Sequence, residues 1–188
     1  MTPYYNKPTQ EGIYRHFSTI ADTCDIPIVL YNVPGRTGVG IAAETVARLV
    51  KNRNVLGVKE AAGSVERVSE ILSLCDTSIM CGDDSLTVPM MLLGAKGVIS
   101  VASNIIPAEL KKMTDACASG DFMTAVAMHR KYWRLFKDLF VESNPIPVKA
   151  AMAMLGMIEE EYRLPLCPLS DANREKLRNT VSECIRSV

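Results

Sequence analysis

Short apolar runs alternate with helical stripes of apolar side chains between residues 10 and 101. Four runs predict strands, at residues 26–31, 55–59, 78–81 and 97–101, and the helical stripes cover residues 10–24, 41–50, 65–75 and 86–93. A chain that forms successive parallel strands must cross back between them, and a helix usually makes that connection. The sequence therefore predicts an α/β fold, in which helices cover a parallel sheet.

Strand signals stop beyond Pro107, and the later periodic segments are helical. These stripes lie at residues 109–119, 122–140, 148–155 and 173–185, with proline-rich turns at residues 144–147 and 164–168. A complete (β/α)8 barrel takes about 250 residues, whereas this chain offers four clear strands and the tail of a fifth at residues 2–5. The pattern indicates the second half of a larger structure, followed by a helical extension.

The composition is that of a globular protein with a small-molecule substrate. Hydrophobic residues make up 48% of the 188 residues and charged residues 22%, which is enough for one sizeable core. Lysine plus arginine and aspartate plus glutamate balance at 21 each. Because there is no excess of positive charge, we expect neither nucleic acid nor a membrane as a partner.

The cysteines and the amino terminus bear on the cellular compartment. The six cysteines lack Cys-x-x-Cys spacing and only two histidines accompany them, so we expect buried thiols in a reducing compartment, and no metal site. No charged segment followed by an apolar one opens the chain, and Lys96 interrupts the apolar stretch at residues 90–102. We expect a cytoplasmic protein.

Two strand ends carry the most reactive side chains. Tyr31 ends the run that leads into Asn-Val-Pro-Gly-Arg-Thr-Gly, and Lys59 ends the run that leads into Glu-Ala-Ala-Gly. Ends of neighbouring parallel strands converge on one site. An amine attacks a ketone only when unprotonated, and lysine has an ordinary pKa of about 10.4. Apolar surroundings favour the neutral amine and a nearby phenol can transfer protons, so the pair suits Schiff-base chemistry.

Each of these residues also has an ordinary interpretation. A lysine at the end of a strand is commonly solvated, and a tyrosine there commonly has its hydroxyl in water.

Two further patterns in the sequence are assigned no cofactor. Gly35, Gly38 and Gly40 have the wrong order for a dinucleotide fingerprint, and the adjacent carboxylates of residues 83–84 have no partners at metal-ligand spacing.

Six motifs follow one another along the chain. They are Thr-Pro-Tyr-Tyr-Asn-Lys-Pro, Tyr-Asn-Val-Pro-Gly-Arg-Thr-Gly, Gly-Val-Lys-Glu-Ala-Ala-Gly, Gly-Asp-Asp, Gly-Val-Ile-Ser-Val and Asn-Pro-Ile-Pro-Val-Lys. In this order they resemble the 4-hydroxy-tetrahydrodipicolinate synthases. The resemblance implies a lyase with a (β/α)8 TIM barrel and a helical C-terminal region, assembled as a homotetramer. Such an enzyme condenses pyruvate with aspartate 4-semialdehyde in lysine and diaminopimelate biosynthesis, without a metal or organic cofactor.

The resemblance also implies roles for single residues. Lys59 is the lysine that forms the covalent pyruvate Schiff base, and Tyr31 transfers protons. Arg36 binds the carboxylate of the aldehyde substrate, for which a guanidinium fork is well suited. On its own, Arg36 has the ordinary interpretation of a solvated loop arginine.

Four other positions match the family by motif. Tyr5 matches a tyrosine that reaches across a subunit interface to complete a proton relay, and Tyr4 matches one that lines a lysine feedback site. The main-chain groups of Gly82 and Ile99 border the pyruvate pocket. Without the resemblance these would be two rim aromatics, a turn glycine and a core residue.

On this basis residues 1–106 are expected to form a partial barrel, and residues 107–188 its last helix and the C-terminal helical region. The family's Gly-Thr-Thr-Gly-Glu segment is absent from the sequence, so we expect a truncated chain and leave open whether it is active. A sialic-acid lyase or keto-deoxy-sugar aldolase uses the same lysine and tyrosine, although Arg36 favours a substrate with a carboxylate. A non-catalytic half-barrel that serves as an assembly or regulatory partner is the remaining alternative.

Overall fold

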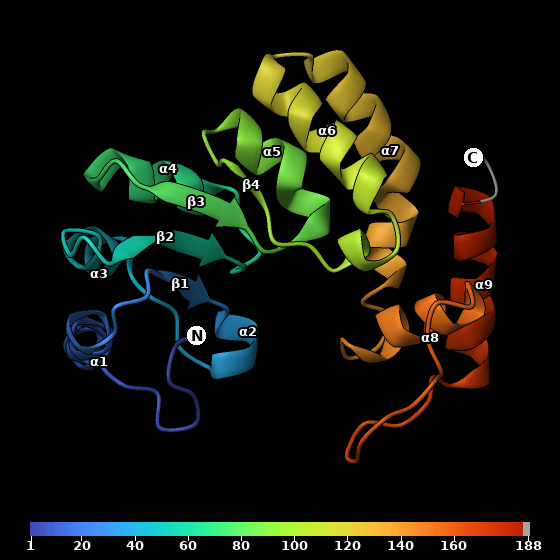
Figure 1. The fold of residues 1–188 in the computed structure, drawn as a ribbon, viewed down its shortest axis with the longest axis horizontal. Helices are drawn as coiled ribbons and strands as arrows, with labels where there is room; N and C mark the ends of the chain where they lie inside the picture. The colour runs from blue at the N-terminus through green and yellow to red at the C-terminus, as the bar shows by residue number, and fades with distance from the viewer. Residues whose placement is uncertain (186–188) are drawn as a thin grey trace. The chain divides into compact units, whose positions relative to one another are not determined.

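The computed structural model describes residues 1–185, which form two compact units (Figure 1). The first unit contains Met1–Ile99, and the second begins at Ser100. All seven residues that the sequence analysis assigned to the site lie in the first unit. The expected division into residues 1–106 and 107–188 stays a prediction about domains.

The first unit is a parallel sheet with helical crossovers. Its strands are β1 (Ile28–Asn32), β2 (Val55–Glu60), β3 (Ser78–Cys81) and β4 (Gly97–Val98), in the spatial order β1-β2-β3-β4. The helices are α1 (Gln10–Thr23), α2 (Pro34–Thr37), α3 (Ala43–Leu49), α4 (Glu66–Leu74) and α5 (Thr87–Leu92), with a 3₁₀ turn, η1 (Asp84–Leu86), before α5. This arrangement confirms the predicted α/β fold with a parallel sheet.

Helices α1, α3 and α4 lie next to one another along the sheet (Figure 1). Helix α1 shows why they form: Thr9 caps its first turn by accepting a bond from Gly12 N, and Ile13 and Phe17 fall on one buried stripe. The core continues through β1, β2, β3 and α5 and includes Leu30, Val46, Val58, Ile71, Ile79 and Met90. The helices therefore cover one face of the sheet with apolar side chains.

Gly57 allows the close approach of β2 and β3. A Cβ atom at this position would lie 2.0 Å from Ser78 O, a distance that no real side chain tolerates. The residue next to it in the chain, Leu56, lies where the register of β1 against β2 shifts, between Ile28 and Val29. The sheet therefore requires glycine at residue 57 for its second strand pairing.

Three local expectations need correction. Residues 2–5 form no strand: Thr2 N donates to Tyr31 O at 3.2 Å, but Tyr5 has a left-handed φ of 70°, which breaks the extended backbone. The strand expected at residues 97–101 is only β4. The loop assumed in the ordinary interpretation of Arg36 is instead helix α2, which Pro34 starts and Gly38 ends with a φ of 74°.

The second unit is helical, as predicted. It contains η2 (Ala102–Asn104), α6 (Pro107–Ser119), α7 (Phe122–Asp138), α8 (Ile146–Met154) and α9 (Asp171–Ile185). Helix α7 packs against α6 and α9, and α8 packs against α9. Between α7 and α9, Thr180 donates to the buried Asp138 carboxylate at 2.7 Å, and Lys176 pairs with the same carboxylate at 2.9 Å. These contacts satisfy a charge that would otherwise be buried alone.

The expectation of buried thiols is wrong for part of the set. All six cysteines are free; Cys81, Cys117 and Cys184 are buried and Cys75 is half-buried, but Cys24 and Cys167 are exposed. Cys24 follows α1 and Cys167 lies in a proline-rich loop, so neither falls on a buried stripe. Within residues 1–185, no helix is both long enough and apolar enough to cross a membrane.

We predict that Gly57→Ala destabilises the protein, because the added Cβ must push β3 away from β2. Overpacking of this kind costs about 1–3 kcal/mol in unfolding free energy. Gly35→Ala is the matched control, since a Cβ there meets no atom within 4 Å. Denaturant unfolding of both variants checks this, and equal stabilities would contradict the close approach of the strands.

We predict that a thiol reagent modifies Cys24 and Cys167 first in the native protein. Burial raises the pKa of Cys81 to about 12, and the thiolate is the reactive form. Burial also raises the pKa of Cys117 and Cys184, so these three thiols should react only after unfolding. Peptide mapping checks the order, and Cys24→Ser/Cys167→Ser should abolish the fast phase. Fast labelling of Cys81 would contradict the packing around β3.

Candidate active site

Lys59 and Tyr31 meet at the carboxyl ends of β2 and β1. They are direct partners in the parallel register, and the Lys59 Nζ lies 4.3 Å from the centroid of the Tyr31 ring. Both side chains are half-buried, whereas Leu30 and Asn32, which alternate with Tyr31, are buried. Alternation therefore places the amine and the phenol together on the more open face of the sheet. The structure brings the two predicted reactive groups into contact.

Gly82 makes room for the lysine. Its N–H donates to Glu60 O at 2.7 Å, which fixes it beside the end of β2. A Cβ at this position would lie 2.6 Å from Ala61 Cβ and 3.1 Å from Lys59 Cε. Only a residue without a side chain leaves the path of the Lys59 side chain undisturbed.

Ile99 continues the same edge of the sheet beyond β4. Its N–H donates to Cys81 O at 2.9 Å, and its side chain is 44% exposed. Ile99 and Gly82 directly follow β4 and β3, so their main-chain groups lie at the same edge of the sheet as Lys59, the second-last residue of β2. In parallel α/β folds this edge carries the functional site.

Arg36 stands on α2, directly after β1. The turn is well anchored, because the buried Thr37 hydroxyl donates to Val39 O at 2.8 Å and Gly38 adopts the left-handed conformation that ends the helix. The Arg36 side chain itself is exposed. The guanidinium is thus carried on a rigid turn that begins where Tyr31 and Asn32 end their strand.

Tyr4 and Tyr5 are not brought against the lysine. The exposed fraction is 63% for Tyr4 and 92% for Tyr5, so both rings extend into solvent. The segment is tied to the sheet at Thr2, whose hydroxyl donates to Tyr31 O at 3.2 Å. Their expected roles in a relay and a feedback site stay predictions.

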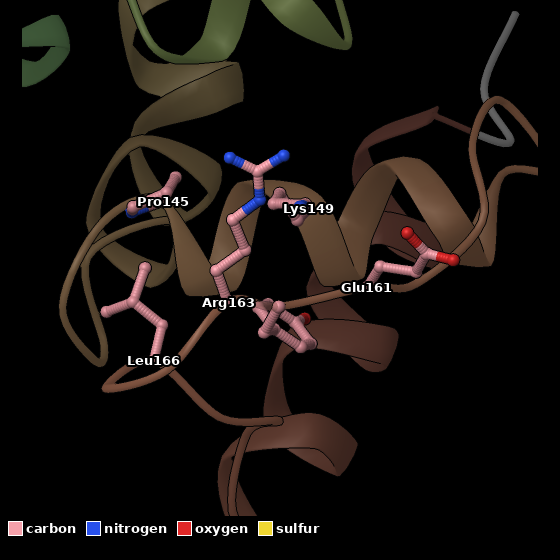
Figure 2. Close-up of a pocket in the computed structure, with 6 residues that line it drawn as sticks. Pro145, Lys149, Glu161, Arg163 and Leu166 are labelled. Carbon is pink, nitrogen blue, oxygen red and sulfur yellow. The ribbon is translucent and has the colours of Figure 1, made fainter.

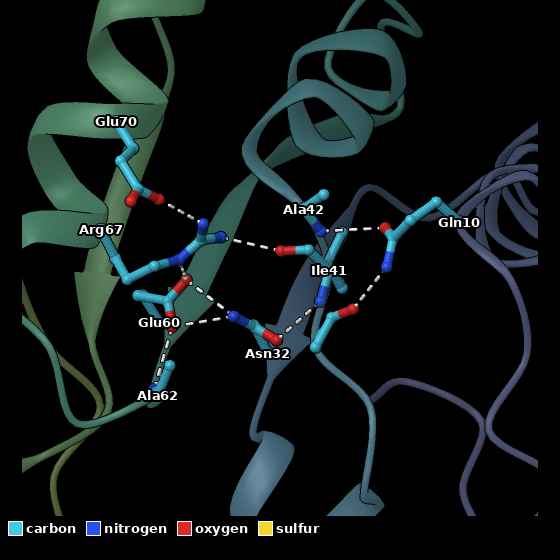
Figure 3. Close-up of polar contacts among 9 residues, drawn as sticks. Gln10, Asn32, Ile41, Ala42, Glu60, Ala62, Arg67 and Glu70 are labelled. Atoms are coloured by element: carbon cyan, nitrogen blue, oxygen red, sulfur yellow. Dashed lines mark hydrogen bonds and ion pairs between the residues drawn. The ribbon is translucent and has the colours of Figure 1, made fainter.

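Sequence analysis missed Glu60, the residue after Lys59. Its carboxylate is only 1% exposed, and Figure 3 shows it at the centre of a polar network on the reverse face of the sheet. Asn32 Nδ2 donates to both carboxylate oxygens at 2.9 Å, Ala62 N donates to Oε1 at 2.9 Å, and Arg67 Nε lies 3.5 Å from Oε2. Burial raises the pKa of Glu60, and its hydrogen bonds to Asn32 and the charge of Arg67 oppose that rise.

The alternation of side chains along a strand could have indicated that Glu60 is buried. If Lys59 faces the open side, then residue 60 faces the helices, and a carboxylate among helices needs partners. The identity of those partners was not readable from the sequence, because Asn32 lies 28 positions away.

A separate pocket of about 430 Å³ lies in the second unit (Figure 2). It is lined by Pro145, Lys149, Glu161, Tyr162, Arg163 and Leu166. The Tyr162 hydroxyl donates to Glu160 at 2.9 Å, and burial together with this carboxylate raises the pKa of Tyr162 to about 12. The pocket holds two cationic side chains, and its Lys149 Nζ lies 5.4 Å from the centroid of the Tyr162 ring, farther than the 4.3 Å between Lys59 and Tyr31. Among the described residues, no group of three or more histidine, cysteine or acidic side chains is placed to hold a metal ion.

Comparison with known proteins agrees with the motifs. The model of the dihydrodipicolinate synthetase family matches residues 1–184. The 4-hydroxy-tetrahydrodipicolinate synthases of Geobacter metallireducens and Sulfurihydrogenibium are 52% and 55% identical over 185 residues. These alignments cover 97% and 96% of this chain, and 64% and 63% of the two relatives.

Solved structures give the same result. The 4-hydroxy-tetrahydrodipicolinate synthase of Methylacidiphilum fumariolicum superposes with a TM-score of 0.96 at 48% identity, over 98% of this chain and 62% of that one. The dihydrodipicolinate synthase of Aquifex aeolicus gives 0.95 at 50% identity, over 97% and 63%. The chain thus spans less than two thirds of the length of these relatives. With a family match from Met1 to Cys184 and this structural agreement, the chain belongs to the dihydrodipicolinate synthetase family.

Proposed function

We propose that this chain carries the Schiff-base lysine and the proton-transfer tyrosine of a 4-hydroxy-tetrahydrodipicolinate synthase. The observation that carries the proposal is the contact of Lys59 Nζ with the Tyr31 ring, 4.3 Å from its centroid, at the ends of paired strands. The reaction would condense pyruvate with L-aspartate 4-semialdehyde in lysine biosynthesis. The proposed activity is that named for the relatives above, and the residue roles follow from the motifs by which this chain resembles the family.

The chemistry begins with the neutral amine of Lys59, which attacks the C2 ketone of pyruvate. Tyr31 moves a proton from the nitrogen to the carbinolamine oxygen, so that water leaves and an imine forms. A proton then passes from C3 to the imine nitrogen and gives an enamine, and this nitrogen gives up a proton to the aldehyde oxygen when the next bond forms. The enamine carbon adds to the aldehyde carbon of the second substrate, whose own amine attacks the imine carbon, closes the ring and releases Lys59.

Pyruvate is supported as the first substrate by a relative. The chloride-inhibited dihydrodipicolinate synthase of Acinetobacter baumannii, 43% identical, is described as a complex with pyruvate. In this chain the main-chain groups of Gly82 and Ile99 would border the ketoacid, because they lie at the same sheet edge as Lys59. No cofactor enters these steps, since the imine itself is the electron sink.

Arg36 would bind the carboxylate of the aldehyde substrate. Two parallel N–H donors of a guanidinium match the two oxygens of a carboxylate, and α2 holds the residue on an anchored turn. A substrate rich in hydroxyl groups would gain little from such a fork. This distinction favours the semialdehyde over the polyhydroxylated aldehydes that sialic-acid lyases and keto-deoxy-sugar aldolases handle at the same step.

The assembly of the protein is proposed to be a homo-oligomer, a tetramer in the family's complete form. The exposure of Tyr5 fits a side chain that completes the relay of a neighbouring subunit, and that of Tyr4 fits a feedback site. A 40% identical relative from Cyanidioschyzon merolae is described with lysine bound. Another relative, 44% identical, is described as a monomeric dihydrodipicolinate synthase variant.

The four parallel strands would be the second half of a (β/α)8 barrel, and the helical unit its C-terminal region. This part of the proposal is supported by the spatial order β1-β2-β3-β4 and by the structural match to the family's solved members. A cytoplasmic location is supported by the six free cysteines, because reducing compartments keep thiols unpaired.

We predict that pyruvate and borohydride give a reduced adduct on Lys59. Peptide mapping by mass spectrometry locates the adduct, and Lys59→Ala should abolish it. Lys96→Ala is the matched control, since this exposed lysine precedes β4 at the opposite end of the sheet. The complete enzyme of Geobacter metallireducens serves as the positive control. Labelling of that enzyme but not of this chain would contradict activity of the chain and favour a non-catalytic partner.

We predict that Tyr31→Phe slows adduct formation while Lys59 stays in place. General acid–base catalysis contributes typically about 10²–10⁴-fold, and the ring that contacts Lys59 is retained in the variant. Quenching the reaction at successive times gives the rate of trapping at saturating pyruvate. A variant that traps pyruvate at the wild-type rate would remove the proton-transfer role of Tyr31.

A further inference from the structure

We infer that Glu60 is a positioning residue, whose carboxylate joins Asn32 and Arg67 to hold the ends of β1 and β2 in the register that sets Lys59 against Tyr31. The inference rests on the proposed function and extends it to the reverse face of the sheet. Glu60 touches no reacting atom, because alternation along β2 directs it away from the face of Lys59.

The register makes the connection direct. Tyr31 pairs with Lys59, and the next pair along the same two strands is Asn32 with Glu60. The Asn32 amide spans the two strands by donating to both oxygens of Glu60 at 2.9 Å. A sliding or splaying of β1 against β2 would therefore break these bonds at the same time as it moved Tyr31 away from Lys59.

The carboxylate also shapes the loop after β2. Ala62 N donates to Glu60 Oε1 at 2.9 Å, and Ala61 N donates to Asn32 O at 2.9 Å. Ala61 is the residue whose Cβ would meet a side chain at Gly82, at 2.6 Å. The network thus fixes the loop that bounds the space around the Lys59 side chain.

The same network closes the turn that carries Arg36. Ile41 N donates to Asn32 Oδ1 at 3.0 Å, and Arg67 Nη2 donates to Ile41 O at 2.8 Å. Since Asn32 and Ile41 flank the segment of residues 33–40, these bonds pin both of its ends. Gln10 adds a second attachment by accepting from Ala42 N at 2.9 Å (Figure 3).

The buried charge of Glu60 and the charge of Arg67 each have specific hydrogen-bond partners, and these partners fix how the two side chains are oriented. Glu60 is 1% exposed, and a carboxylate at such a site needs its full set of donors. Arg67, with 17% side-chain exposure, faces Glu60, the Ile41 carbonyl and Glu70 Oε2. An apolar pair would fill the same space, but it would not determine which atoms of the two strands face one another.

The discriminating experiment exchanges donors and acceptors within the network. In Glu60→Gln an amide nitrogen replaces a carboxylate oxygen, so that a donor faces the donors of Asn32 and Arg67. Adding Asn32→Asp restores a carboxylate–amide pair with its roles reversed, because the carboxylate now on β1 accepts from Ile41 N and from the side-chain amide now on β2. Glu11→Gln is the matched control, since this exposed carboxylate also contacts two arginines, Arg15 and Arg48.

Each variant is treated with pyruvate and borohydride under conditions where it remains folded, and the limiting rate and half-saturating pyruvate concentration are measured separately. We expect Glu60→Gln to lower the limiting rate about 10–100-fold, since misplacement by about 1 Å costs that much. The double variant should recover most of the loss, and Glu11→Gln should match the wild type. If Glu60→Gln does not fold, Arg67→Lys replaces it, since one ammonium nitrogen cannot reach the three acceptors that the separate nitrogens of the guanidinium contact.

The positioning role is overturned if Glu60→Gln, or Arg67→Lys in its place, traps pyruvate at the wild-type limiting rate. It is also overturned if the rate only follows the folded fraction and the double variant restores nothing, because Glu60 then acts through stability alone. Failure of the proposed function looks different: the wild-type chain itself would give no adduct on Lys59, and the positioning role would fall with it.

Discussion

The pairing of β1 with β2 is the contact on which the rest of the first unit depends. One register aligns Tyr31 with Lys59 on the open face and Asn32 with Glu60 on the covered face. Because side chains alternate along a strand, a slip by one residue would exchange the two faces and bury the amine among helices. The contact of Lys59 with Tyr31 and that of Glu60 with Asn32 are therefore two consequences of the same hydrogen-bonded ladder.

Close packing at glycines complements this register. Gly57 lets β3 approach β2, and Gly82 leaves the space through which Lys59 extends. Neither glycine has a left-handed φ, so their value lies in the absence of a side chain rather than in backbone freedom. The geometry of this unit therefore depends on the absence of side chains at Gly57 and Gly82 as well as on the side chains of Lys59 and Tyr31.

Much of the fold was predictable from local patterns. Residues 78–81 were correctly predicted as a strand, and β2 was correctly predicted to begin at Val55. Apolar runs and helical stripes are signals within a single segment of the chain, so they can be read without the tertiary structure. The expected strand at residues 2–5 failed, since an extended tail and a strand look alike until a backbone angle such as that of Tyr5 is known. The expected burial of Cys24 and Cys167 was wrong for a related reason. Cysteine as a residue type favours burial, but the position of these two outside the helices and strands leaves them exposed.

The sequence by itself determined the α/β class and the residues proposed as reactive, because the period of apolar residues and the order of the motifs are properties of the chain. Tertiary structure alone decided that Lys59 lies over the Tyr31 ring and that Glu60 has Asn32, Ala62 and Arg67 as partners. The physical reason is that register and partner choice depend on contacts between segments about 30 residues apart. No local propensity encodes such contacts, and they form only when the strands pair and the helices close over one face of the sheet.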